Sequence, residues 1–151
     1  MIWALCHVPM ARPMTDRPLP ILRVRPSQVS QRVLVVGDPG RAARAASLLS
    51  ECEQLASNRE YVTYRGRFGS ADITVCSHGV GSAGAGICFE ELVRAGARTI
   101  IRAGSCGALV DGIADGELIV ATGAVREDGL SPRLAPISYP CLLYTSDAAD
   151  E

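Results

Sequence analysis

Short apolar runs alternate along the chain with glycine-containing turns and alanine-rich stretches. The runs are rich in Val and Ile, which favours strands, whereas Ala and Leu recur at helical spacing in the stretches between them. We predict strands over 32–36, 61–68, 72–77, 99–102 and 117–122, and helices over 41–50 and 83–95. Strands that alternate with helices indicate an α/β fold with a largely parallel sheet.

We expect one domain, of which residues 30–140 form the N-terminal portion. Five prolines between Pro9 and Pro26 make the first part of the chain a poor helix or central strand. Residues 1–29 are therefore predicted to be a leader that is partly disordered or arises from upstream read-through. Residues 141–151 resemble a translated sequencing adapter, so we interpret them as an artefact and the domain as incomplete at its C-terminus.

Composition excludes several classes of partner and ligand. The formal net charge is −1, so the chain has no basic field for nucleic acid or a membrane surface. The longest uncharged run, 73–89, is shorter than a membrane span and contains four glycines. None of the six cysteines forms a CxxC pair, which argues against a structural metal. We expect a cytoplasmic chain without a structural metal site.

Two strand ends carry an arginine beside a glycine-rich turn, which is typical of an anion site. The first turn runs from Gly37 to Arg41 and opens a predicted helix, whose amides and dipole favour negative charge. Arg102 lies at the end of a nearly apolar strand, with Ser105 three residues later. A guanidinium in that position needs a partner, and a phosphate would supply it. In open α/β sheets ligands bind at the carboxyl ends of strands, so we expect the two arginines to share one pocket.

The turn between these two suggests a different function. Gly79, Gly81 and Gly84 match the GxGxxG pattern of dinucleotide-binding domains. That pattern expects an acidic residue about 20 residues further on, and no acid occurs between Glu91 and Asp111. A dinucleotide-binding domain is therefore kept only as an alternative.

Several separated motifs resemble the purine nucleoside and uridine phosphorylase family. They are Val35-Val-Gly-Asp-Pro-Gly-Arg41, Asn58-Arg-Glu-Tyr61, Ser77-His-Gly-Val-Gly-Ser-Ala-Gly84, Glu90-Glu-Leu92, Ile100-Ile-Arg-Ala-Gly-Ser-Cys-Gly107, Ala124-Val-Arg-Glu-Asp128 and Ser138-Tyr-Pro140. Their order and spacing cover roughly residues 30 to 140 and look closest to protozoan-type purine nucleoside phosphorylases. The resemblance implies a three-layer domain with a mixed, largely parallel twisted sheet flanked by helices.

The resemblance also implies a reaction and its residues. A pentosyltransferase of this family cleaves a nucleoside with inorganic phosphate as co-substrate, giving a free base and a pentose 1-phosphate. The resemblance implies that it uses no metal or organic cofactor. Arg41 and Arg102 would be the catalytic residues. The phosphate would be bound by Gly37, Arg41, Arg102 and Ser105, and by Arg59 acting in the neighbouring subunit of a dimer-based, possibly hexameric, homo-oligomer. Cys106 and Gly107 would lie beside the nucleoside, and His78 is interpreted as a structural or supporting residue.

The family resemblance leaves the substrate open. The match does not separate purine nucleosides from uridine, nor ribose from deoxyribose. The family usually presents a histidine upstream of the first strand to the ribose, and none occurs between Met14 and Gln31. A nucleosidase of the same fold, which needs no phosphate, is an alternative that the two arginines disfavour. The chain as given also lacks the family's ribose- and base-binding half, so we expect it to be inactive alone.

Overall fold

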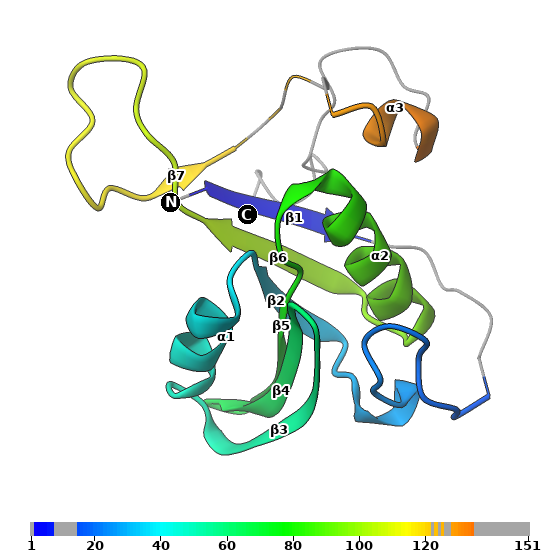
Figure 1. Ribbon diagram of the computed structural model, residues 1–151. Helices are drawn as coiled ribbons and strands as arrows, with labels where there is room; N and C mark the ends of the chain where they lie inside the picture. The colour runs from blue at the N-terminus through cyan, green and yellow to red at the C-terminus, as the bar shows by residue number, and fades with distance from the viewer. Residues whose placement is uncertain (1, 8–14, 122, 124, 126–127, 135–151) are drawn as a thin grey trace.

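One twisted sheet runs through the centre of the protein (Figure 1). The computed structural model describes residues 2–7, 15–121, 123, 125 and 128–134. The strands are β1 (Ile2–His7), β2 (Arg32–Val36), β3 (Ser50–Asn58), β4 (Tyr61–Phe68), β5 (Ala71–Ser77), β6 (Thr99–Gly104) and β7 (Ile119–Val120). The helices are α1 (Pro39–Ala46), α2 (Gly81–Arg94) and α3 (Ser131–Leu134), with a 3₁₀ turn, η1 (Pro26–Gln28).

The strand order in the sheet is β3-β4-β5-β2-β6-β1-β7. Its centre is parallel, because β2 pairs in parallel with both β5 and β6. The strands around this centre pair mainly antiparallel, as β3 does with β4, β4 with β5 and β1 with β6. The predicted α/β fold with a mixed sheet flanked by helices is therefore confirmed.

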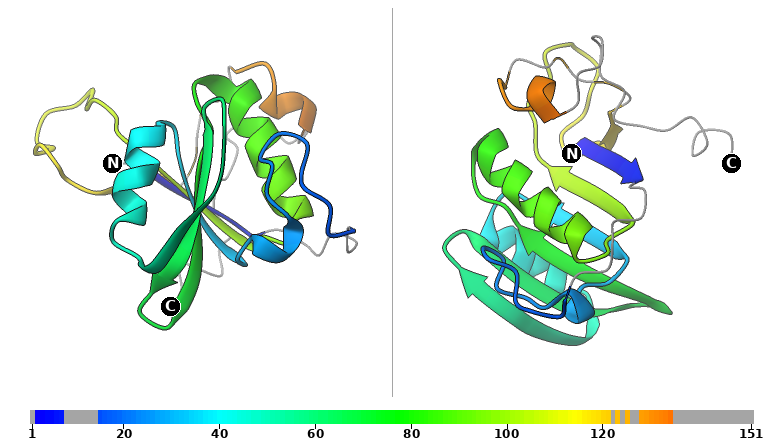
Figure 2. Two further views of the ribbon diagram at one scale, coloured as in Figure 1. Left: turned by 60° about the horizontal axis from the view of Figure 1, so that its bottom comes forward. Right: turned by 90° about the vertical axis from the view of Figure 1, so that its right-hand side faces the viewer.

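Helices α1 and α2 cover opposite faces of the sheet, as Figure 2 shows. Strand β2 explains how both faces are filled, since successive side chains of a strand point to opposite sides. Val33 and Val35 belong to the core under α2, whereas Val36 packs with Leu34 and Ala42 on the α1 side. The chain thus forms three layers, helix, sheet and helix.

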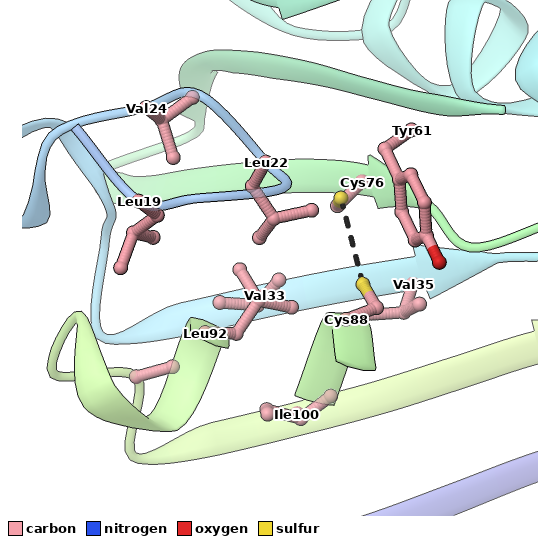
Figure 3. Close-up of a cluster of buried hydrophobic side chains, with 11 residues drawn as sticks. Leu19, Leu22, Val24, Val33, Val35, Tyr61, Cys76, Cys88, Leu92 and Ile100 are labelled. Atoms are coloured by element: carbon pink, nitrogen blue, oxygen red, sulfur yellow. Dashed lines mark hydrogen bonds between the residues drawn. The ribbon is translucent and has the colours of Figure 1, made fainter. Parts of the chain in front are cut away.

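The larger core lies between the sheet and α2 and includes part of the predicted leader (Figure 3). Leu19, Leu22 and Val24 are each no more than 1% exposed, although no regular element contains them. In the same core the Sγ atoms of Cys76 and Cys88 lie 3.6 Å apart as free thiols. The core therefore draws on residues that precede the first predicted strand.

Part of the segment expected to be a leader packs against the rest of the domain in the structure. The carboxylate of Glu91, in α2, accepts hydrogen bonds from the backbone N–H groups of Ile21 and Leu22 at 2.8–3.2 Å. Asn58 donates its side-chain amide to the carbonyl of Ile21 at 2.7 Å. Proline keeps this segment out of helices and strands, but side chains from elsewhere satisfy its backbone, so burial remains favourable.

The first residues of the expected leader form a strand. Residues 2–7 form β1, which lies between β6 and β7 rather than outside the sheet. The prolines begin only at Pro9, so they place no restriction on the apolar run before it. A strand at this position pairs the backbone groups along the edge of β6.

The boundaries of the other elements follow the prediction with several differences, and β6 ends at Gly104 rather than at residue 102. Helix α1 begins at Pro39 and ends at Ala46, because strand β3, which was not predicted, begins at Ser50. Helix α2 begins two residues earlier than expected. Among the described residues of the strand expected over 117–122, only β7 is strand. Residues 141–151, the predicted artefact, lie outside the described residues. None of the described helices is long and apolar enough to cross a bilayer.

Candidate active site at the strand ends

A cavity of about 840 Å³ lies at the carboxyl ends of β2, β5 and β6. Residues from four segments line it, namely the start of α1, the tip of the β3–β4 hairpin, the turn after β5 with the start of α2, and the end of β6. They are Gly37, Asp38, Pro39, Arg41, Glu60, His78, Gly79, Val80, Gly81, Ser82, Ala85 and Arg102. Two arginines and two carboxylates face this space, so selectivity for an anion depends on where each charge lies rather than on a uniformly positive field.

Arg41 reaches the cavity from the first turn of α1. Asp38 is the N-cap of this helix, and its Oδ1 accepts a hydrogen bond from the Arg41 N–H at 2.9 Å. Pro39 follows at the first helical position, where no N–H is required. The Arg41 guanidinium donates through Nη2 to the Ser105 hydroxyl, also at 2.9 Å. This hydrogen bond therefore links the segment after β2 to the segment after β6.

Arg102 enters the same cavity from within β6. It pairs in register with Val35 of β2, so its side chain rises from the face of the sheet that α2 covers. The Arg102 Nε–H donates to Nε2 of His78 at 3.1 Å. A Cβ placed on Gly104 would lie 2.8 Å from the Arg102 Nη1 atom. Glycine at position 104 therefore leaves the room that this guanidinium occupies.

His78 is the partner of Arg102 and is only 3% exposed. The backbone N–H of His78 donates to the Val36 carbonyl at 3.0 Å, and the imidazole meets the edge of Phe89 with ring centroids 6.1 Å apart. Burial lowers the pKa of His78, and the nearby charge of Arg102 lowers it further. The imidazole is therefore neutral at pH 7.

Local backbone geometry explains why glycine occupies several positions of the turn after β5. Gly79 and Gly81 adopt φ values of +72° and +88°, which disfavour other residues. A Cβ on Gly84 would lie 2.7 Å from the carbonyl oxygen of His78. The pattern of glycines thus serves a tight turn and a close approach of α2, and it does not by itself require a dinucleotide.

The predicted phosphate residues fall into two groups. Gly37, Arg41 and Arg102 line one cavity, and Ser105 joins them through its hydrogen bond to Arg41. Arg59 lies at the tip of the β3–β4 hairpin, at φ +56°, and does not line this cavity.

The two residues predicted beside the nucleoside are also absent from the cavity lining. Cys106 and Gly107 follow β6 and are exposed. Their role, and that of Arg59 in a neighbouring subunit, stay predictions.

The sequence analysis assigned no role to two acidic residues of the cavity. Asp38 lies within the first glycine turn, where its position before Pro39 is a helix-start signal. Glu60 reaches the cavity because its carbonyl accepts a hydrogen bond from the Ser77 hydroxyl at 2.6 Å, which holds the hairpin tip against the end of β5. Glu60 could be found only by predicting β3 and hence the hairpin. Within the described residues, no cluster of three or more His, Cys, Asp or Glu side chains could hold a metal ion.

Comparison with known proteins assigns this arrangement to a family. A sequence profile described as "Phosphorylase superfamily" matches residues 31–149. The chain belongs to the phosphorylase superfamily. The match includes most of the segment predicted to be an artefact, whose origin stays a prediction.

Relatives with different named substrates are similar to the chain to nearly the same extent. It is 41% identical over 123 residues to guanosine phosphorylase of Halorubrum lacusprofundi, covering 82% of this chain and 51% of that protein. It is 42% identical over 128 residues to purine nucleoside phosphorylase of Plasmodium falciparum, covering 84% of this chain and 52% of that protein. The crystal structure of uridine phosphorylase from Vibrio fischeri matches with a TM-score of 0.77 and 43% identity, covering 85% of this chain and 54% of that one. The chain thus spans about half the length of the relatives that it matches.

Proposed function

We propose that the protein containing this chain is a nucleoside phosphorylase. It would cleave a purine nucleoside or uridine reversibly, with inorganic phosphate as co-substrate and no organic cofactor or metal. One observation carries this proposal: Arg41 and Arg102, which come from different strand ends and lie 61 positions apart in the sequence, line a single cavity. Relatives named for phosphorolysis of different nucleosides support the reaction class and leave the base open.

In the proposed reaction the bond between C1′ and the base nitrogen breaks while a phosphate oxygen bonds to C1′. The sugar becomes positively charged as the base departs, and overall the base gains the proton that hydrogen phosphate gives up in forming its ester. Arg102 and Arg41 would hold the phosphate beneath C1′ with charged hydrogen bonds. Their contribution is to position the nucleophile, which shortens the search for a productive geometry, rather than to transfer protons.

Ser105 and Gly37 would complete the phosphate site. The Ser105 hydroxyl already accepts from Arg41, so its own proton is free to be directed to a phosphate oxygen. Gly37 leaves the backbone uncovered beside the cavity. Arg59 would reach the site of a neighbouring subunit, and Cys106 and Gly107 would contact the nucleoside. As the family resemblance implies, the protein would be a cytoplasmic homo-oligomer built from dimers.

A nucleosidase is the competing proposal from the same fold. Hydrolysis uses water, which needs no pair of guanidinium groups around a common space. The shared cavity of Arg41 and Arg102 therefore favours phosphorolysis. The deciding measurement is base release by the full-length gene product from inosine, guanosine and uridine, with and without phosphate. We expect release to require phosphate and to yield one pentose 1-phosphate per base, whereas phosphate-independent release with free pentose would establish a nucleosidase.

Replacing Arg102 tests the site itself. Loss of a charged hydrogen-bonding partner costs ~2–3 kcal/mol, so Arg102→Ala should raise the KM for phosphate by roughly 30- to 150-fold. Arg44→Ala is the matched control, because Arg44 is an exposed arginine of α1 that does not line the cavity. Steady-state kinetics at varied phosphate would measure both, and an unchanged KM in Arg102→Ala would remove the proposed phosphate site.

A further inference from the structure

We propose that His78 is a positioning residue that fixes the guanidinium of Arg102 for anion binding. The His78 Nε2 atom accepts the Nε–H of Arg102 at 3.1 Å, which leaves the two terminal nitrogens of the guanidinium for a ligand. This inference rests on the proposed function in so far as the ligand is phosphate. The hydrogen bond itself can be tested without it.

The chemistry of the two side chains determines the state of the imidazole. A guanidinium nitrogen can only donate, so Nε2 of His78 must carry a lone pair rather than a proton. The ring is then neutral and holds its single proton on Nδ1. Burial and the charge of Arg102 both lower the pKa of His78, which agrees with a neutral ring.

Contacts from β2, from α2 and from the turn after β2 surround His78. Its backbone N–H is bonded to Val36 at the end of β2, and Phe89 of α2 meets the ring at an interplanar angle of 60°. The ring also lies beside Gly37, where a Cβ would be 4.0 Å from its Cε1 atom. Because the imidazole is fixed in this way, the direction in which it accepts a hydrogen bond is fixed too.

The second nitrogen of the ring indicates that the bond to Arg102 decides its orientation. Nδ1 is buried and forms no well-aligned hydrogen bond among the described residues. The nearby backbone groups of His78 and Gly79 raise the pKa of the ring, but by less than burial and Arg102 lower it. A buried N–H without a partner is unfavourable, and buried polar groups are normally paired. The ring nevertheless adopts this orientation, which directs its lone pair at the guanidinium of the cavity.

Arg41 lacks an equivalent support. It is an exposed residue, and its partner Ser105 has a hydroxyl that can rotate and can donate or accept. Arg102 is half-buried between His78 and Gly104. The cavity thus combines one guanidinium that the fold holds in place with one that can adjust to a ligand.

The first experiment measures the proton position in the unaltered protein. Long-range ¹H–¹⁵N spectra of the histidine-labelled full-length protein, with the His78 signals assigned by their absence in His78→Gln, report the tautomer. We expect a neutral ring protonated on Nδ1 at pH 7.5. A ring protonated on Nε2, or an imidazolium, would overturn the proposal whether or not the protein is a phosphorylase.

The second experiment separates positioning from packing with two variants. His78→Leu removes the acceptor, and His78→Gln keeps one at a similar distance from the backbone. We expect His78→Leu to raise the KM for phosphate about tenfold or more, since a hydrogen bond to a charged group is lost. In His78→Leu the KM for the nucleoside should change by less than about twofold. In His78→Gln the KM for phosphate and the KM for the nucleoside should both stay within about threefold of those of the unaltered protein.

Equal increases in the two variants, or no increase in either, would contradict a positioning role. If His78→Leu does not fold, His78→Gln and the tautomer measurement still decide. Failure of the unaltered protein to require phosphate would instead refute the proposed function, and the tautomer would then be the sole test of the bond.

Discussion

Two glycine-rich turns begin the two long helices of this chain, and they do so in opposite ways. The turn over 37–41 leads from β2 into α1, and the turn over 78–84 leads from β5 into α2. Both line the same cavity, although the helices cover opposite faces of the sheet. The first turn satisfies its helix with its own Asp38 side chain. In the second turn the N-cap of α2 is Val80, whose side chain cannot accept a hydrogen bond.

The glycines of the two turns differ as well. Gly37 has room for a Cβ, whose nearest neighbour would be the Gly79 carbonyl oxygen at 3.6 Å. Gly84 has none, because the His78 carbonyl oxygen would lie 2.7 Å away. The first turn is thus shaped by capping side chains and the second by close backbone packing. The two turns therefore have similar compositions but are stabilised in different ways at the same site.

The largest effect that would sharpen this contrast is expected from Gly84→Ala. Alanine is the better helix former by about 1 kcal/mol, but here its methyl group would collide with a backbone oxygen that cannot move independently. We expect a net loss of at least ~2 kcal/mol in the free energy of unfolding. Urea unfolding would measure it, with Gly37→Ala as the matched control, which should lose less than ~1 kcal/mol. Equal stability of the two variants would mean that α2 can shift away from β5.

A second comparison, between the predicted strands and strand β3, shows which parts of the fold the sequence could predict. Strands 32–36, 61–68 and 72–77 combine β-branched residues with flanking turns, and the structure places strands at or within one residue of these bounds. Strand β3 has the sequence SECEQLASN and its first five residues are exposed at the sheet edge. In this edge strand, buried and exposed side chains do not alternate. Neither the hydrophobic pattern nor strand propensity therefore identifies it.

Burial without regular structure was the second source of error. Leu19, Leu22 and Val24 lie among prolines, which correctly exclude a helix but say nothing about packing. Within this segment the backbone N–H groups of Ile21 and Leu22 donate to Glu91, about 70 residues away in the sequence. Such long-range hydrogen bonds are invisible to local patterns.

The candidate site follows the same division. The rule that ligands bind at the carboxyl ends of strands located Arg41 and Arg102. Arg41 follows β2 and Arg102 lies near the end of β6, and these two strands pair in parallel. Glu60 required the unpredicted hairpin. The bond between His78 and Arg102 required the register of β2, β5 and β6, which the sequence does not state.

A smaller effect is expected when the first turn loses its cap. Asp38→Ala removes the acceptor for the Arg41 N–H and should cost ~1 kcal/mol of unfolding free energy. Asp38→Asn keeps an acceptor of similar capping strength without the charge, so it should lose only a few tenths of that. Urea unfolding of both variants distinguishes a cap from an ion-pair effect. If Asn were as damaging as Ala, the carboxylate charge beside Arg41 would matter more than the cap.

The smallest effect, and the only gain, is expected when the second turn is given the cap that it lacks. Val80 has the extended backbone of an N-cap, with φ −102° and ψ 139°, and its side chain is fully exposed. Val80→Asn therefore loses no packing and supplies an acceptor for an N–H of the first turn of α2. We expect a gain of ~0.5–1 kcal/mol in the free energy of unfolding. Val110→Asn, at an exposed valine outside any helix start, is the control and should change stability little. If Val80→Asn gave no gain while Asp38→Ala gave its loss, the amides at the start of α2 would already be satisfied in another way, and the contrast between the two turns would reduce to the packing of their glycines.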